Sequence, residues 1–180
     1  MMIRLPMPAK IETERLLLQR LKYEDAEEIF YTYASKPEAT KYLAWITHRS
    51  VDDTRAYLRY AVESWNYGID YSYSIRLKNL LLIGSIGVLH DHGRVQLGYV
   101  ISPTHWNKGY TTEACRHVLQ ILKSFGDLYR IGTFVDMENI ASIKVLQKCG
   151  MVEEARLEKW FRFVNQNNQP KDCILFRCLP

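Results

Sequence analysis

Apolar and polar positions alternate along the middle of the chain in the manner of a β-sheet. Residues 69–75 alternate with a period of two, which predicts a half-buried strand. Residues 81–89 are mostly apolar and interrupted by two glycines, and residues 96–101 form a third strand-like run. Because Asp91-His92-Gly93 is a turn sequence between the last two runs, we expect the three strands to form a meander.

Apolar residues recur at helical spacing in four other segments. The predicted helices span residues 21–36, 50–68, 110–125 and 140–149. The second of them opens on Ser50 with Asp53 three residues later, which is a capping box. Further strands are predicted at residues 16–20, 131–135, 152–164 and 171–179. The order of these elements predicts a mixed α/β fold in which one sheet of about seven strands is flanked by four helices.

Length and composition are those of a globular domain, and we expect residues 1–180 to form a single one with residues 1–10 as an extended lead-in. The chain has 180 residues, of which 47% are hydrophobic and 24% charged. No apolar run approaches the roughly 18 residues of a membrane span, and residues 1–10 lack the apolar core of a signal peptide. We therefore expect a cytoplasmic protein without a membrane partner.

Charge and cysteine content narrow the possible ligands. The net charge of +4 is mild and the basic residues are interspersed with acids, which suits a phosphate-bearing ligand and argues against nucleic acid. The cysteines form no Cys-x-x-Cys pair and predict reduced thiols. They are Cys115, Cys149, Cys173 and Cys178. A single His-x-His at residues 90–92 is too little for a metal site, so we expect none. Monomer and homodimer both remain open.

The segment His105-Trp106-Asn107-Lys108-Gly109-Tyr110-Thr111-Thr112-Glu113 joins a predicted strand to a predicted helix. The first N–H groups of a helix lack internal partners, the helix dipole is positive there, and Gly109 lets the backbone approach an anion closely. Lys108 adds a positive charge. These residues predict a phosphate-binding loop, and an ordinary tight turn is the alternative for so short a motif.

The same segment resembles motif A of the GNAT N-acetyltransferases, most closely in the branch of the ribosomal-protein N-terminal acetyltransferases. The family pattern Trp-Gly-Lys-Gly-Tyr-Ala-x-Glu-Ala is matched in order by residues 106–114, with Asn107 in place of the first Gly and Thr111 in place of Ala. Residues 97–103, residues 139–151 and the opening Thr13-Glu14-Arg15-Leu16-Leu17-Leu18 are also similar to the family. The resemblance covers nearly the whole chain, and the joint order of these pieces is more specific than any one of them.

This resemblance implies the GNAT fold, with a mostly antiparallel central sheet, and acetyl-CoA as the acetyl donor. In the family the pantetheine arm pairs with the strand before the loop, and the pyrophosphate lies on the loop. The implied cofactor-binding residues are Val100, Ile101 and Ser102 through their backbone, the loop residues Asn107, Lys108, Gly109, Tyr110, Thr111 and Thr112, and Asn139 and Ser142 at the next helix. N-capping of that helix is the alternative role of Asn139.

The catalytic candidates also follow from the resemblance. Many GNAT enzymes place a tyrosine four residues after the position of Ser142 to protonate the departing thiolate, and this chain has Leu146 there. The branch of the ribosomal-protein enzymes has a serine at the position of Ser142, so the resemblance implies that Ser142, or a water that it holds, is the proton donor. Relatives often carry Glu where this chain has Gln96, so the general base stays open. His90 has a suitable unperturbed pKa, Tyr99 could line the acceptor site, and a water chain is an equal alternative.

Three functions compete for this sequence. The first is an acetyl-CoA-dependent N-acetyltransferase that transfers the acetyl group directly to a primary amine. The acceptor would be the N-terminal α-amine of a ribosomal or other protein, or a small molecule such as an amino acid, polyamine or antibiotic. The second is a non-catalytic acyl-CoA-binding module. The third, a nucleotide-binding protein of another class, is disfavoured because the chain has neither a P-loop nor a Gly-x-Gly-x-x-Gly turn.

Overall fold

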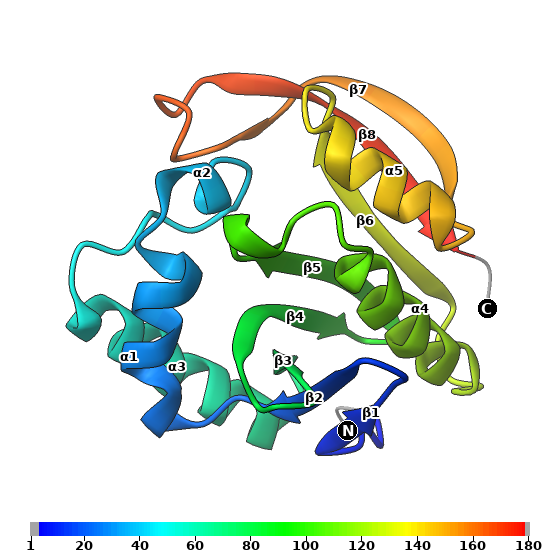
Figure 1. Cartoon of the computed structure of the whole chain (residues 1–180). Helices are drawn as coiled ribbons and strands as arrows, with labels where there is room; N and C mark the ends of the chain where they lie inside the picture. The colour runs from blue at the N-terminus through cyan, green and yellow to red at the C-terminus, as the bar shows by residue number, and fades with distance from the viewer. Residues whose placement is uncertain (1–3, 179–180) are drawn as a thin grey trace.

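The computed structural model describes residues 4–178 and folds them around one mostly antiparallel sheet (Figure 1). Its strands are β1 (Lys10–Glu12), β2 (Leu16–Arg20), β3 (Asp70–Leu77), β4 (Leu82–Asp91), β5 (Arg94–Ile101), β6 (Arg130–Asp136), β7 (Val152–Arg162) and β8 (Pro170–Cys178). Its α-helices are α1 (Ala26–Ile29), α2 (Pro37–Thr40), α3 (Val51–Tyr67), α4 (Tyr110–Lys123) and α5 (Ile140–Lys148). The strand order is β1-β2-β3-β4-β5-β6-β8-β7, and β5 with β6 is the one parallel pair among the described residues. The predicted mixed α/β fold is confirmed.

The N-terminal part of the chain differs from the prediction in three places. At the end of the predicted lead-in, β1 adds an eighth strand that pairs with β2, and three residues are too few to show an alternation. The first predicted helix is a 3₁₀ turn over Tyr23–Asp25, the four-residue α1 and a π-helical turn over Phe30–Ala34. Pro37, predicted to end this helix, instead begins α2, because its fixed φ and missing N–H suit a first helical turn.

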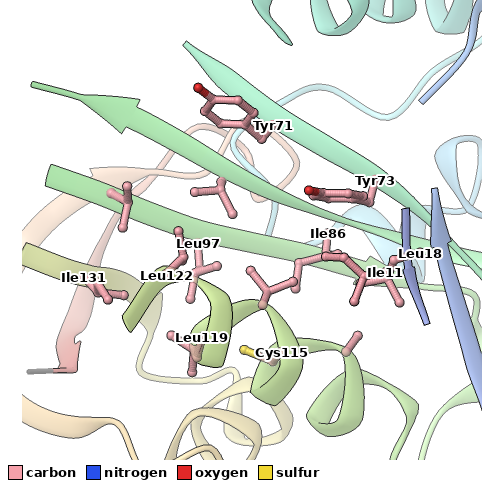
Figure 2. Close-up of a cluster of buried hydrophobic side chains, with 14 of the residues drawn as sticks. Ile11, Leu18, Tyr71, Tyr73, Ile86, Leu97, Cys115, Leu119, Leu122 and Ile131 are labelled. Atoms are coloured by element: carbon pink, nitrogen blue, oxygen red, sulfur yellow. The ribbon is translucent and has the colours of Figure 1, made fainter. Parts of the chain in front are cut away.

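The larger core lies between the sheet and α4, as Figure 2 shows. Cys115, Leu119 and Leu122 of α4 are all but fully buried and pack in one cluster with Leu97 of β5 and Ile131 of β6. These three residues recur at the helical spacing that the sequence predicts for this segment, and Leu122 belongs to the predicted apolar stripe itself. Burial of that stripe fixes α4 against the two strands, so the N-terminus of α4 is held close to the end of β5.

Helices α1 and α3 cover the opposite face of the sheet. Ile29 of α1 and Leu58 of α3 are fully buried in a second cluster that includes Val100 of β5. Successive side chains of β5 therefore enter different cores, since Val100 faces α3 while Leu97 and Ile101 face α4. Within residues 4–178, none of the helices has the length and apolar character needed to cross a membrane.

Strands β5 and β6 pair over a short distance and then separate (Figure 1). The parallel pairing joins Arg94 to Arg130, Val95 to Ile131 and Gln96 to Gly132, and it ends there. Beyond that point β6 continues in pairing with β8, and β5 continues in pairing with β4. The second halves of β5 and β6 are thus neighbours without a shared ladder, which leaves β5 backbone groups available on that side.

Candidate active site

The backbone N–H and C=O groups of successive β5 residues point alternately towards β4 and towards the gap between β5 and β6. The Ser102 N–H donates to the Ile83 carbonyl over 2.8 Å, which sets the direction of that alternation. The backbone groups of Val100, like those of Ser102, therefore turn towards β4. The groups of Tyr99 and Ile101 turn towards the gap. Of the three backbone positions predicted for cofactor binding, the structure brings Ile101 to the gap and directs Val100 and Ser102 away from it.

Two side chains donate hydrogen bonds to β5 carbonyl oxygens at the gap. The β5 backbone between these two carbonyls is left exposed to the gap. Thr133 Oγ1 of β6 donates to Leu97 O over 2.7 Å, and Trp106 Nε1 donates to Ile101 O over 2.8 Å. Tyr99 lies between these carbonyls, and its N–H faces the gap without a strand partner. Sequence reasoning did not single out this N–H, because the direction of a backbone group depends on cross-strand register.

The predicted loop does open α4 in the geometry of an anion-binding helix start. Asn107 and Gly109 adopt left-handed conformations with φ of 60° and 78°, and α4 begins at Tyr110. The Glu113 N–H donates to Gly109 O, whereas the earlier N–H groups of this helical turn, among them those of Thr111 and Thr112, precede the first internal bond. A side chain added to Gly109 would meet only Arg15 within 4 Å. These features fit a bound pyrophosphate.

Thr13 and Arg15 of the N-terminal segment bind Glu113, which follows this loop in the first turn of α4. We call these three residues the clamp. Glu113 Oε1 accepts from Thr13 Oγ1 over 2.6 Å and from the Arg15 N–H over 2.9 Å. Glu113 Oε2 accepts from Arg15 Nε over 2.6 Å. Burial raises the pKa of Glu113, but these hydrogen bonds and the Arg15 charge outweigh it, so that the pKa lies below its usual value. The carboxylate is therefore ionised at neutral pH.

The Arg15 guanidinium also contacts the loop itself. It donates to Lys108 O over 3.0 Å and lies 4.8 Å from the centre of the Tyr110 ring. The Lys108 ammonium turns back to Thr104 O at 3.0 Å and stays exposed. Arg15 was not predicted as a site residue, because nothing local in the sequence indicates that it meets a carboxylate 98 residues away. With Lys108 it places a second positive charge at the loop.

Tyr99, Asn139 and Ser142 meet where β5 faces the start of α5. The hydroxyl oxygens of Tyr99 and Ser142 are 2.7 Å apart, and either hydroxyl can donate. Burial raises the pKa of Tyr99, so its phenol stays protonated at neutral pH. Asn139 Oδ1 accepts from the Ser142 N–H over 3.2 Å, which is the N-cap geometry that the sequence offered as its alternative role. Leu146 is fully buried in the core.

His90 does not lie with the other candidates. It pairs with Val95 at the start of β5, whereas Ile101 pairs with Gly84 at the other end of that ladder. Its Nδ1 is 3.1 Å from Gly68 O, and its Nε2 accepts from the Gly93 N–H over 3.0 Å. Both ring nitrogens are therefore used to fix backbone. Among residues 4–178, no three His, Cys, Asp or Glu side chains are grouped so as to hold a metal ion.

The chain belongs to the GNAT acetyltransferase family. The family model described as an acetyltransferase (GNAT) domain matches residues 15–152. An uncharacterised N-acetyltransferase of Bacillus subtilis (strain 168), YoaA, is 31% identical over 175 residues, which cover 92% of this chain and 94% of that protein. The family predicted from the motifs is thereby confirmed.

Solved structures support the same fold. The microcin C7 self-immunity acetyltransferase MccE, in complex with acetyl-CoA and AMP, aligns with a TM-score of 0.87 and 18% identity over 97% of this chain and 98% of its own. The ribosomal L7/L12 α-N-protein acetyltransferase RimL aligns with a TM-score of 0.85 and 15% identity over 95% and 94%. At these identities the likeness concerns the fold. Enzymes of the family use acetyl-CoA, so the predicted cofactor agrees with the family.

Proposed function

We propose that this protein transfers the acetyl group of acetyl-CoA directly to a primary amine. The observation that carries the proposal is the separation of β5 from β6 beside the loop that opens α4. It presents the Tyr99 N–H on one side and the free N–H groups of a helix start on the other. A pantetheine arm fits along the first, and a pyrophosphate fits on the second. No cysteine belongs to these groups, which favours direct transfer over an acyl-enzyme route.

The residues at the gap suit the steps of such a transfer. When bound, acetyl-CoA supplies a thioester whose carbonyl carbon accepts the amine. The Tyr99 N–H would polarise the thioester carbonyl as charge develops on its oxygen, and a preorganised donor of this kind contributes about 2.7–4 kcal/mol. Ser142 Oγ would donate a hydrogen bond to the departing sulfur, which then takes its proton from the water that accepts the amine proton, and the Tyr99 hydroxyl holds Ser142 in place. Asn139 acts by capping α5, which fixes the position of Ser142.

Proton removal from the attacking amine falls to water on the exposed face of β5. Gln96 is exposed there and cannot ionise, and His90 stands at the other end of the ladder. An α-amine has an unperturbed pKa of about 7.7–8.0, so a fair fraction is already neutral near pH 7. An α-amine needs only water as the proton acceptor, whereas an alkylamine, with a pKa nearer the value of about 10.4 for lysine, would react through a smaller neutral fraction.

The acceptor is a primary amine of one of two classes. The likeness to a ribosomal-protein enzyme supports a protein α-amine, and at 15% identity it does so through the fold alone. A small amine is the second class. We place the protein in the cytoplasm, where acetyl-CoA and both classes of amine occur together.

The test measures release of CoA thiol from acetyl-CoA against a panel of amines and N-terminal peptides. Calorimetric binding of CoA to the same sample runs in parallel. Acceptor-dependent release with micromolar CoA binding is the expected outcome. Tight CoA binding without release across the panel would replace the enzyme by an acyl-CoA-binding module. Failure of CoA to bind would refute the assignment of the loop.

A further inference from the structure

Asp70, at the start of β3, is a mostly buried carboxylate that has no cationic partner within residues 4–178. Its one hydrogen bond is from Ser72 Oγ over 2.8 Å. A carboxylate offers about four acceptor positions, so a single neutral hydroxyl leaves most of them unused. Burial raises the pKa of Asp70, as expected for a charge removed from water without compensation. The surroundings of Asp70 are therefore suited to a cation that the described part of the chain does not provide.

The carboxylate lies on the same face of the sheet as two glycines. Ser72 of β3 pairs with Gly87 of β4, and Gly87 pairs with Gly98 of β5, so the three lie on one face. Asp70 Oδ1 is 3.5 Å from the position that a Cβ on Gly87 would occupy. Gly98 is exposed, and a Cβ added there would meet no atom within 4 Å. Side chains at either glycine would fill the space between Asp70 and β5.

The second of these glycines adjoins the place of the proposed reaction. Gly98 immediately precedes Tyr99, whose N–H faces the gap beside β6. The Asp70 carboxylate lies over β4, which is one strand spacing of about 4.8 Å from β5. A nitrogen above Gly98 is then roughly 5–8 Å from the carboxylate. At carbon–carbon bond lengths near 1.5 Å, about three to five methylene groups bridge that distance.

Helix α3 also contributes a side chain to the surroundings of Asp70. Burial, together with the charge of Asp70, raises the pKa of Tyr57 on α3, so this phenol stays neutral, and it forms a hydrogen bond with Ser72, the residue that also binds Asp70. The Tyr57 ring also stacks on Trp45 with centroids 6.1 Å apart. Aromatic rings beside a carboxylate favour an alkyl ammonium group, because the ring binds the methylenes and the carboxylate binds the charge.

We propose that Asp70 binds a second ammonium group of the acceptor, and that the preferred substrates are short diamines or polyamines. The inference rests on the proposed acetyl transfer and names its substrate class. Asp70 is then a specificity-determining residue, which holds the far nitrogen while the near nitrogen stands above Gly98. Its carboxylate gains the cationic partner that residues 4–178 do not supply.

The experiment compares 1,4-diaminobutane with n-butylamine, which differs only in lacking the second nitrogen. We expect the wild-type protein to favour the diamine in kcat/KM by on the order of tenfold or more. Asp70→Asn should abolish that preference and leave the butylamine rate unchanged. Asp91→Asn is the matched control, since Asp91 is exposed at the end of β4 and already pairs with Arg94. It should keep the preference.

The number of methylene groups between the two nitrogens of the diamine tests the distance between Asp70 and Gly98. The preference should be greatest for three to five methylene groups and weaken for 1,2-diaminoethane. A diamine preference that survives Asp70→Asn would overturn the proposal. Equal slowing of butylamine and diaminobutane in Asp70→Asn would also overturn it, since that pattern indicates a structural or proton-transfer role.

Direct binding separates this inference from the proposed function. Calorimetry should show 1,4-diaminobutane binding to the CoA-loaded wild-type protein and to Asp91→Asn, and no binding to Asp70→Asn. If no amine in the panel is acetylated, the proposed function fails while this binding experiment still decides the role of Asp70. Absence of binding to the wild-type protein would refute the cation site.

Discussion

At the scale of single residues, Ser142 and Tyr99 depend on each other across two elements. Their hydroxyl oxygens are 2.7 Å apart, one on α5 and one on β5. We predict that Tyr99→Phe lowers kcat roughly fivefold to tenfold, because one supporting hydrogen bond of about 1–1.5 kcal/mol is lost. The KM for acetyl-CoA should hardly change, since the backbone of Tyr99 is kept. Steady-state thiol release at saturating amine measures both constants.

The Ser142→Ala variant tests whether the Tyr99 hydroxyl acts through Ser142. Loss of the hydroxyl that donates to the departing sulfur should reduce kcat by about 100-fold. If Tyr99 acts only through Ser142, the double variant should be no slower than Ser142→Ala alone. Effects that multiply would contradict this, because they would mean that the two hydroxyls act independently.

At the scale of elements, the clamp joins the segment before β2 to the first turn of α4. The pKa of Glu113 is lowered, so its ionised form is favoured by folding, and this contribution to the free energy of unfolding is complete above the ordinary pKa of 4.5. It disappears as the pH falls through the lower pKa of the folded state. We predict that wild type is more stable than Glu113→Gln at pH 7, and that the difference persists to about pH 4.5 and shrinks below it.

Urea unfolding between pH 7 and about pH 3 measures that difference directly. Glu14→Gln is the control, because Glu14 is exposed and lies beside the clamp without belonging to it. It should match wild type throughout. A difference between wild type and Glu113→Gln that did not vary with pH would show that the clamp does not act through the charge of Glu113.

Gly109, which precedes α4, can be compared with Gly150, which follows α5 and has a similar backbone conformation. Gly109 and Gly150 have φ of 78° and 80°, and neither would place a Cβ against protein backbone. Gly109→Val and Gly150→Val should each cost roughly 1–2 kcal/mol of stability, because valine resists the left-handed conformation. Only Gly109→Val should also weaken CoA binding, by about tenfold or more. Equal CoA affinity of the two variants in calorimetry would remove Gly109 from the phosphate site.

At the scale of the whole molecule, the sequence predicted what is encoded locally. Helical spacing identified α3, α4 and α5, and the turn at Asp91-His92-Gly93 identified the pairing of β4 with β5. The segment from Trp106 to Ala114 indicated the family. Each of these signals lies within a window of about 15 residues, where periodicity and capping can be read.

What the sequence did not predict depends on register and on distant contacts. The direction of the Tyr99 N–H follows from the ladder between β4 and β5, in which a shift of one residue would exchange Tyr99 with Val100. Arg15 reaches Glu113 across 98 residues. His90 was a reasonable base by its residue type, yet its ring nitrogens hold Gly68 and Gly93 at the wrong end of the strand. Such features need the assembled sheet.

Because the proposed cofactor site draws on the N-terminal segment, β5, α4 and α5, its occupation should stabilise the whole molecule. A ligand at 100 times its Kd raises the free energy of unfolding by about 2.7 kcal/mol. For a chain of 180 residues this corresponds to a rise in Tm of about 5–10 °C. We predict such a rise with acetyl-CoA, growing with the logarithm of its concentration. In thermal unfolding, Gly150→Val should start from a lower Tm and keep the full shift, whereas Gly109→Val should lose most of it. A wild-type Tm that did not respond to acetyl-CoA would contradict a site built from all four parts.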